Sequence, residues 1–88
     1  MSYTVEFSSA ASRELRKLDP PIRRRILGAI SELEVAPRPS GAKRLVGNEE
    51  IWRIRVGDYR VLYRVLDQVV TVRIVRVAHR RAVYENMP

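Results

Sequence analysis

The sequence predicts an α+β domain in which one sheet, largely antiparallel, is covered by a helical hairpin. Three observations lead to this prediction. Residues 2–7 alternate between apolar and polar side chains, as a half-buried strand does. Residues 8–35 carry apolar residues at helical spacing, and residues 51–78 return to alternation, interrupted by two short turns. The expected order is β-α-α-β-β-β, and the chain is expected to be a single domain, residues 1–88.

Two helices are expected after the first strand, whose apolar face holds Tyr3, Val5 and Phe7. The first helix, over 8–18, begins at a serine that can serve as its N-cap. Asp19 then caps a second helix over 21–35, with proline in its first turn. The apolar stripe of this second helix consists of Ile22, Ile26, Leu27, Ala29, Ile30 and Leu33. Because each helix has one apolar stripe, both are expected to pack on the same face of the sheet.

The second half of the chain is expected to form a three-stranded meander. Residues 36–50 are rich in proline, glycine and serine, which is typical of a loop. Three strands follow, over 51–56, 59–66 and 69–78. Gly57-Asp58 and Asp67-Gln68 join them as short turns, so neighbouring strands run antiparallel. The first strand is expected to join the other side of this sheet, and the tail, 79–88, to form a final helical turn.

Charge is the strongest global signal. The chain has 17 lysine and arginine residues against 10 aspartate and glutamate residues, a net charge of +7. Residues 51–88 hold eight basic and three acidic side chains, whereas residues 1–50 hold nine and seven. A basic half of this kind favours a polyanionic partner, with nucleic acid as the default and an acidic protein as the alternative.

The composition also indicates where the protein acts. The chain has no cysteine, which argues against a disulfide-stapled secreted scaffold. Its N-terminus shows no signal peptide, and no apolar run approaches the roughly 18 residues that span a membrane. We therefore expect a cytoplasmic protein without a membrane partner.

Arginines alternate with apolar residues along the first two strands of the meander. Arg53 and Arg55 point away from the face that holds Trp52, and Arg60 and Arg64 share one face of the next strand. If the hairpin register brings these faces together, four guanidinium groups converge. Each arginine alone is typical of a solvated surface. Like charges across a sheet cost stability, so the group favours an anion site, a groove for a nucleic-acid backbone.

Other residues with binding or catalytic chemistry flank this groove. Lys43 and Arg44 precede the sheet, and Arg80 and Arg81 follow its last strand. The chain has one histidine, His79, and its four glycines are scattered. Neither a metal-ligand spacing nor a glycine-rich phosphate loop is present, so no metal or other cofactor is expected.

Several stretches of the chain, in order and at matching spacing, resemble the RelE/ParE superfamily of toxins from bacterial type II toxin–antitoxin systems. They are SYTVEF (2–7), RELRKL (13–18), the proline- and lysine-containing loop at 37–47, WRIRVGDYRVLYRV (52–65) and VAHRRAVY (77–84). The resemblance covers essentially the whole chain. It implies a RelE-like fold, similar to small microbial ribonucleases, with a compact sheet and an N-terminal helical hairpin.

The resemblance also implies an activity: a metal-independent, ribosome-dependent mRNA endonuclease, or mRNA interferase, that inhibits translation. In this reaction the ribose 2′-OH attacks the adjacent phosphate and leaves a cyclic phosphate. The implied catalytic residues are Arg60, Arg80 or Arg81, Tyr84 and His79. The implied RNA- and phosphate-binding residues are Lys43, Arg44, Arg53, Arg55 and Arg64.

One departure from the family pattern bears on the chemistry. Arg53 and Arg55 stand where the RelE pattern has lysines. Arginine stays protonated, so it stabilises charge but does not accept a proton. Proton removal is thereby left to Tyr84, to His79 or to ribosomal groups.

The resemblance further implies partners: a cognate antitoxin, the ribosome and mRNA, with operator DNA contacted only through the antitoxin complex. Two other functions remain open at this point. A ParE-type toxin shares the fold and inhibits DNA gyrase by binding, and a degenerate toxin binds only its antitoxin. The basic cluster favours the nuclease, because gyrase binding does not require it.

Overall fold

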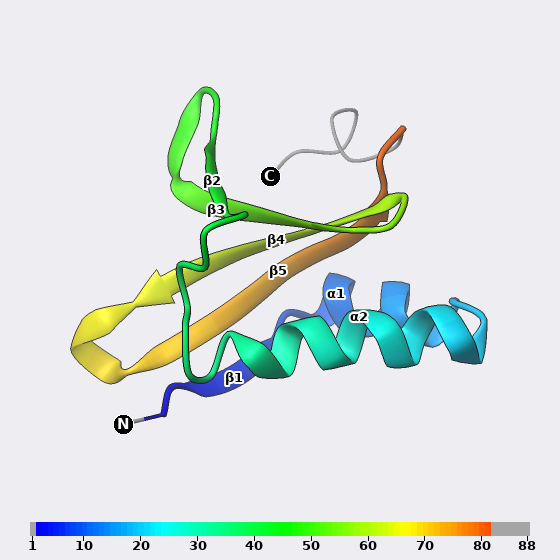
Figure 1. Ribbon diagram of the computed structural model, residues 1–88, viewed down its shortest axis with the longest axis horizontal. Helices are drawn as coiled ribbons and strands as arrows, with labels where there is room; N and C mark the ends of the chain where they lie inside the picture. Colours follow the sequence, from blue (N-terminus) through cyan, green and yellow to red (C-terminus); the bar gives the residue numbers. More distant parts are fainter. Residues whose placement is uncertain (1, 82–88) are drawn as a thin grey trace.

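A computed structural model describes residues 2–81, which form two helices and one five-stranded sheet (Figure 1). The elements are β1 (Thr4–Phe7), α1 (Ser9–Arg16), α2 (Pro20–Glu32), β2 (Lys43–Leu45), β3 (Asn48–Val56), β4 (Tyr59–Leu66), the 3₁₀ turn η1 (Asp67–Val69) and β5 (Thr71–His79). The strand order is β1-β5-β4-β3-β2, with β1 parallel to β5 and all other neighbours antiparallel. Neither helix in the described part is long and apolar enough to cross a membrane.

Both helices lie on one face of the sheet, as the apolar stripes predicted (Figure 1). Ser8 caps α1, because its Oγ accepts a hydrogen bond from the Ala11 backbone N–H at 3.0 Å. Pro20 opens α2 directly after Asp19. The buried core between helices and sheet consists of Ala11, Leu15, Ile26, Ile30, Leu33, Ile54, Val61, Tyr63, Val72, Ile74 and Val77. We call this side of the sheet the helix face, and its other side the open face.

The α+β class is confirmed, but the expected loop over 36–50 contains an additional hairpin. Strand β2 pairs with β3 across the Val46-Gly47 turn: Leu45 lies opposite Asn48, and after a register shift Arg44 and Lys43 lie opposite Trp52 and Arg53. Gly47 adopts φ 86°, a conformation that glycine reaches without steric cost. Leu45 and Ile51 are buried together on the open face. This contact stabilises the additional hairpin, so the sheet begins before residue 51, where the alternating pattern starts.

Three smaller expectations also differ from the structure. Helical spacing predicts Leu27 on the apolar stripe of the second helix, but it is 38% exposed because it lies one position past the buried Ile26. Phe7 is 37% exposed at the edge strand β1. The last strand begins at Thr71, after η1 and Val70, whose φ is 49°. Most of the expected terminal helical turn falls on residues 82–88, outside the described residues.

Helix α1 closes the edge of β5 where β1 ends. The Ser8 Oγ donates to the Val75 carbonyl at 2.7 Å. The Glu14 carboxylate accepts from the Val77 backbone N–H at 2.7 Å and from the Arg76 Nη2 at 2.6 Å. The hydrogen bond that Arg76 donates to Glu14 raises the pKa of Arg76. These contacts satisfy polar groups of β5 beyond the end of β1 and tie α1 to that strand.

Candidate nucleic-acid interface

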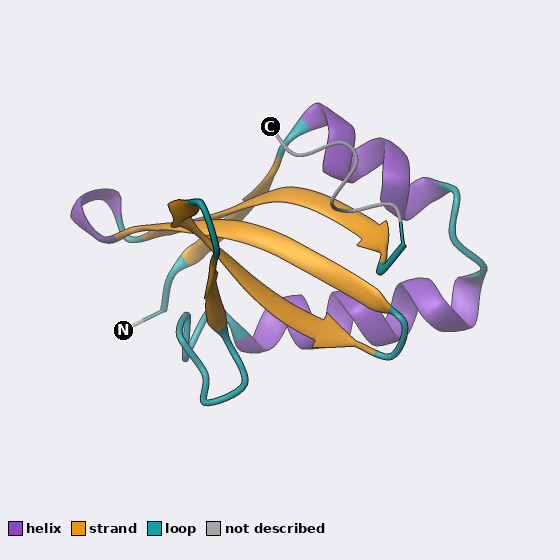
Figure 2. Ribbon diagram, turned by 90° about the horizontal axis from the view of Figure 1, so that it is seen from above, coloured by secondary structure: helices purple, strands orange, loops and turns teal. Residues whose placement is uncertain are grey.

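The strand register gathers basic side chains on the open face, which Figure 2 views from above. Because directly opposed residues on antiparallel strands share a face, the pairs in the register define its members. Arg55 lies opposite Arg60, and Lys43 lies opposite Arg53. Arg64 and Arg73 also oppose each other. The four arginines that the alternation singled out, with Lys43, therefore share one surface.

A small apolar cluster forms the floor of this surface. Leu45, Ile51, Leu62 and Ala78 are buried together on the open face, away from the main core. Arg53 lies opposite Leu62, and Arg60 lies opposite Ala78. Arg60 is only 9% exposed, so its guanidinium sits on the sheet and does not extend into solvent.

The basic residues enclose a hollow of about 230 Å³ at the β3–β4 turn. It is lined by Arg55, Gly57, Asp58, Tyr59, Arg60 and Arg80. The Arg60 Nη1 donates to the Arg80 carbonyl at 3.2 Å, and the Arg80 backbone N–H donates to the Asp58 carbonyl at 2.8 Å. These two hydrogen bonds hold the chain after β5 against the turn, so Arg80 lines the hollow. Arg81 is exposed, and its backbone N–H donates to the His79 Nδ1 at 3.3 Å.

Charge compensation differs between the two ends of the open face. Arg73 forms an ion pair with Glu6 at 3.1 Å, and Arg64 approaches Glu50 at 3.6 Å. Within residues 2–81, Arg53, Arg55 and Arg80 form no ion pair. The end with the hollow therefore keeps an excess of positive charge, which suits a phosphate group. Guanidinium groups there can neutralise charge that develops on a phosphorane, but they supply no base.

A register shift between Leu62 and Tyr63 settles the position of Arg73 and Arg76, which have opposite parity in the sequence. The shift places Arg73 opposite Arg64 and Arg76 opposite Leu62. Arg76 nevertheless turns to Glu14 on α1 and contributes its charge there. Arg73 is thus the one that joins the open face.

Two predicted site residues lie on the helix face. His79 opposes Tyr59, and their rings meet edge to face with centroids 5.4 Å apart. Arg44 opposes Trp52 and places its guanidinium 5.2 Å from the indole centroid. The structure therefore brings neither of them to the hollow. Tyr84 lies outside the described residues.

Polar contacts that periodicity could not reveal hold the segment before β2. The Tyr63 hydroxyl donates to the Pro37 carbonyl at 2.8 Å, and burial raises the pKa of Tyr63 to about 12. The Arg38 guanidinium donates to both Asp67 carboxylate oxygens and lies 5.7 Å from the Trp52 centroid. This hydrogen bonding lowers the pKa of Asp67. These contacts tie the segment to the far end of β4, away from the hollow.

Comparisons with known proteins agree with this architecture. The model of the family described as the ParE toxin of the type II toxin–antitoxin system, parDE, matches residues 5–84. The chain is 39% identical to toxin RelG of Mycobacterium tuberculosis, over 98% of this chain and all of that protein. It is 30% identical to the mRNA interferase toxin RelE of Escherichia coli, over 91% of this chain and 85% of that one.

Solved structures show the same fold. The toxin–antitoxin complex RelBE2 from Mycobacterium tuberculosis matches with a TM-score of 0.79 and 37% identity, over 90% of this chain and 99% of that chain. A free Escherichia coli RelE toxin with two arginines replaced by alanine matches with a TM-score of 0.80 and 28% identity, over 96% of this chain and 90% of that chain.

Proposed function

This chain belongs to the RelE/ParE superfamily of toxins from type II toxin–antitoxin systems, and from that premise we propose that it is an mRNA interferase. It cleaves mRNA on the ribosome, without a metal ion, and thereby inhibits translation in the cytoplasm. Its relatives support this proposal, because the Escherichia coli protein RelE is itself named an mRNA interferase.

One observation carries the proposal: Arg55 and Arg60 face each other across the β3–β4 hairpin, beside Arg80, around one hollow. Directly opposed like charges weaken a sheet. A phosphodiester bound between them offsets this repulsion and receives charge-assisted hydrogen bonds from more than one side. The open face thus provides the basic groove that an RNA-cleaving toxin requires.

In the proposed reaction, the ribose 2′-OH loses its proton and attacks the adjacent phosphate, and the bond from phosphorus to the 5′ oxygen breaks. The products are a 2′,3′-cyclic phosphate and a 5′-OH, whose oxygen takes up a proton from water. Arg60 and Arg80 neutralise the charge of the phosphorane, the interaction that typically contributes most in such sites. Arg53, Arg55, Lys43 and Arg64 hold the flanking phosphates. Tyr84 or a ribosomal group removes the 2′-OH proton, because His79 lies on the helix face beside Tyr59.

The proposal includes a cognate antitoxin, since solved relatives are complexes of toxin with antitoxin. An acidic antitoxin segment laid along the open face neutralises the groove and blocks RNA. Contact with operator DNA is expected only through that complex.

The test is primer extension on mRNA loaded in purified ribosomes, with wild-type protein, Arg60→Ala and Arg60→Lys. We expect cuts inside decoding-site codons with the wild type, and a loss of about 100-fold or more with Arg60→Ala, the usual cost of one donor to a developing oxyanion. Arg60→Lys keeps the charge and the nearly buried position, so it separates loss of charge from loss of packing. An intact message with the wild type would sink the nuclease proposal.

A second candidate function rests on the family model, whose description names ParE. A ParE-type toxin inhibits DNA gyrase by binding, so a supercoiling assay distinguishes the two functions. Inhibition of supercoiling together with intact mRNA would favour ParE-type action. Inactivity in both assays, with antitoxin still bound, would indicate a degenerate toxin.

A further inference from the structure

The outward side of helix α2 carries a stripe of exposed residues that repeats every three to four positions. At this spacing residues share one face of a helix, and the buried Ile26 and Ile30 occupy the opposite face. The helical turns continue past the end of α2, because the Val35 backbone N–H donates to the Glu32 carbonyl at 3.2 Å. We call this the outer stripe, and it lies at the outside of the molecule (Figure 1). Its exposed members are Pro21, Arg24, Gly28, Ser31, Glu32 and Val35.

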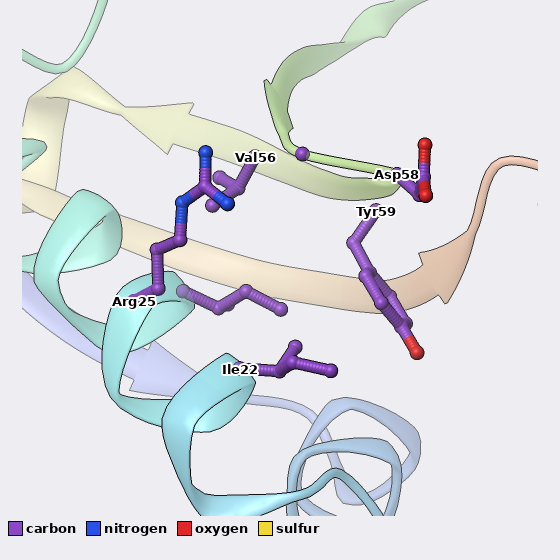
Figure 3. A pocket seen from close by; sticks show the side chains of 7 residues that line it. Ile22, Arg25, Val56, Asp58 and Tyr59 are labelled. Carbon is purple, nitrogen blue, oxygen red and sulfur yellow. The ribbon is translucent and has the colours of Figure 1, made fainter.

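Arg25 does not belong to the outer stripe. Figure 3 shows its guanidinium reaching up from the helix toward the β3–β4 turn. A Cβ placed on Gly57, in that turn, would meet the Arg25 Nη1 at 3.3 Å. The side chain lines a cleft of about 270 Å³ between α2 and the turn, together with the core residues Ile22 and Ile26. The outer stripe therefore carries one cation and one carboxylate.

The outer stripe is symmetric about Gly28, with opposite charges on its two sides. Arg24 lies four positions before Gly28, and Glu32 lies four positions after it. Pro21 and Val35 likewise lie seven positions before and after it, and supply apolar surface at the two ends. When two such helices pack antiparallel about a two-fold axis at Gly28, each Arg24 lies opposite the Glu32 of the second copy.

The two charges of the outer stripe lack partners at helical spacing inside the chain. Glu32 ends α2, where the helix macrodipole disfavours a carboxylate. A cation four positions earlier would stabilise it, but that position is Gly28, which is also the position four after Arg24. In the described part of the chain, neither Arg24 nor Glu32 forms an ion pair. An antiparallel second copy supplies a partner for both.

Gly28 destabilises the isolated helix but allows close approach to its backbone. Glycine inside a helix is less stable than alanine. Outside its own helix turns, no atom of the described chain lies within 4 Å of a Cβ placed on Gly28, so internal packing does not require glycine there. The neighbouring Ser31 hydroxyl turns back along the helix and donates to the Gly28 carbonyl at 2.8 Å. The centre of the outer stripe is therefore open to a second helix.

We propose that α2 is the interface of a homodimer, in which the outer stripes of two copies pack antiparallel around Gly28. Two Arg24–Glu32 ion pairs link the copies, and Val35, which is 77% exposed, adds apolar area at each end. The 13 residues of α2 span about 20 Å, which gives a contact below the standard interface size, so the dimer should be weak and concentration-dependent. Because the helices lie on the helix face, both open faces stay accessible, and dimerisation does not require nuclease activity (Figure 1).

The test is sedimentation equilibrium of the full chain at about 0.15 M salt, where a Debye length of about 8 Å screens the overall repulsion between two copies. Three variants address the ion pairs: Arg24→Glu, Glu32→Arg, and the double variant Arg24→Glu/Glu32→Arg. Each single variant places like charges opposite each other in its own dimer, whereas the double variant restores opposite charges. Arg25→Glu is the matched control, because it makes the same charge change one position away, outside the outer stripe.

We expect the wild-type dimer to dissociate reversibly on dilution, and each single charge variant to weaken association about tenfold or more. The double variant and Arg25→Glu should associate as the wild type does. Mixing the two single variants should restore the association that neither shows alone, because position 24 of each chain then faces an opposite charge at position 32 of the other.

A change at Gly28 separates dimerisation from folding. Gly28→Leu should raise the melting temperature of the monomer, because leucine has the higher helix propensity and the space around this position is open. The same side chain should abolish association, since it keeps the two helix backbones apart. Thermal melts of dilute samples and sedimentation of concentrated ones measure the two effects.

Three results would overturn the inference. The first is a wild type that remains monomeric up to its highest soluble concentration; loss of antitoxin binding in Arg24→Glu would then assign the outer stripe to the antitoxin. The second is a dimer that survives in the single charge variants and in Gly28→Leu, which would place the interface elsewhere. The third is a loss in Arg25→Glu as large as that in Arg24→Glu, or no association in the mixture, because net charge and not pairing would then govern association.

Discussion

The same strands form both faces of the sheet, but the helix face buries apolar side chains whereas the open face carries charged ones. On the helix face, Val61 and Tyr63 are fully buried in a continuous apolar core. On the open face, Arg60 and Arg64 alternate with Leu62 along the same strand. Because β4 is shared, its backbone is stabilised from one side and positions charge on the other. The helix face should therefore govern unfolding, and the open face should govern activity.

The largest effect should come from a cavity on the helix face. Ile26 is 1% exposed, whereas its neighbour Leu27 on the same turn of α2 is 38% exposed. Ile26→Ala should lower the free energy of unfolding by about 2–5 kcal/mol, and Leu27→Ala should change it by about 0.5 kcal/mol or less. Urea melts of both variants measure the contrast. Equal losses would show that packing on this face does not hold the fold.

Removing charge from the open face should instead reduce cleavage and leave the free energy of unfolding nearly unchanged. Arg55 is exposed, faces Arg60 and forms no ion pair within the described residues. Arg55→Gln should leave the free energy of unfolding within about 0.5 kcal/mol of wild type, or raise it slightly by relieving repulsion. Cleavage of ribosome-bound mRNA should fall about tenfold or more, since a phosphate contact is lost.

Arg55→Lys serves as the control for this variant, because it keeps the charge but removes the planar fork. Its activity should lie between those of the wild type and Arg55→Gln. A variant that unfolds easily, or one that cleaves at the full rate, would break the separation between the two faces.

Alternation predicted the face of each arginine on β3 and β4 correctly, because a strand repeats every two residues whatever its partner. The register remained open from the sequence, and it decides whether Arg55 meets Arg60. The position of His79 depended on where β5 starts and on the shift beside Tyr63, neither of which leaves a local signal. Whether His79, Arg81 or Tyr84 takes part in catalysis stays a prediction.

The missed hairpin has a different cause. Strand β2 and the start of β3 are polar: Lys43, Arg44, Glu49 and Glu50 are exposed. An edge hairpin with one small buried contact, through Leu45 and Ile51, has too little apolar pattern to distinguish it from a loop. The Gly47 turn was the only clue, and glycine is common in loops as well.

A smaller effect is expected at Tyr63, where the helix face holds the loop before β2. Tyr63→Phe removes the hydrogen bond to the Pro37 carbonyl and should cost about 1 kcal/mol at neutral pH. The pKa of Tyr63 is raised to about 12, so the wild type contributes this stability in full below pH 10 and loses it as pH rises. The unfolded chain ionises first, and the shift corresponds to about 2–3 kcal/mol.

Tyr63→Phe lacks the ionisable hydroxyl. Its free energy of unfolding, lower than that of the wild type at neutral pH, should therefore approach the wild-type value above pH 10 and exceed it toward pH 12. Chemical denaturation at neutral and at alkaline pH measures the loss of stability and its reversal. A constant difference between the two proteins at every pH would show that Tyr63 ionises as freely in the fold as in the unfolded chain.

The smallest effect should come from Asp67, which ties the far end of β4 to Arg38 and Tyr3 in an exposed setting. The Arg38 guanidinium, followed by the Tyr3 hydroxyl, lowers the pKa of this carboxyl below 3.8 in the fold. Its contribution is therefore present above that value and is lost as pH falls through the lower, folded pKa. Asp67→Asn should melt slightly earlier than wild type at neutral pH, and the two should coincide in strong acid. Added salt should narrow the difference in stability at neutral pH, because the pair is solvated.

Cleavage by Asp67→Asn should remain at the wild-type level, since this network lies at the opposite end of the strand from the hollow at Gly57. A loss of cleavage in Asp67→Asn would mean that the two ends of the sheet are coupled, and that the open face depends on more than its own arginines.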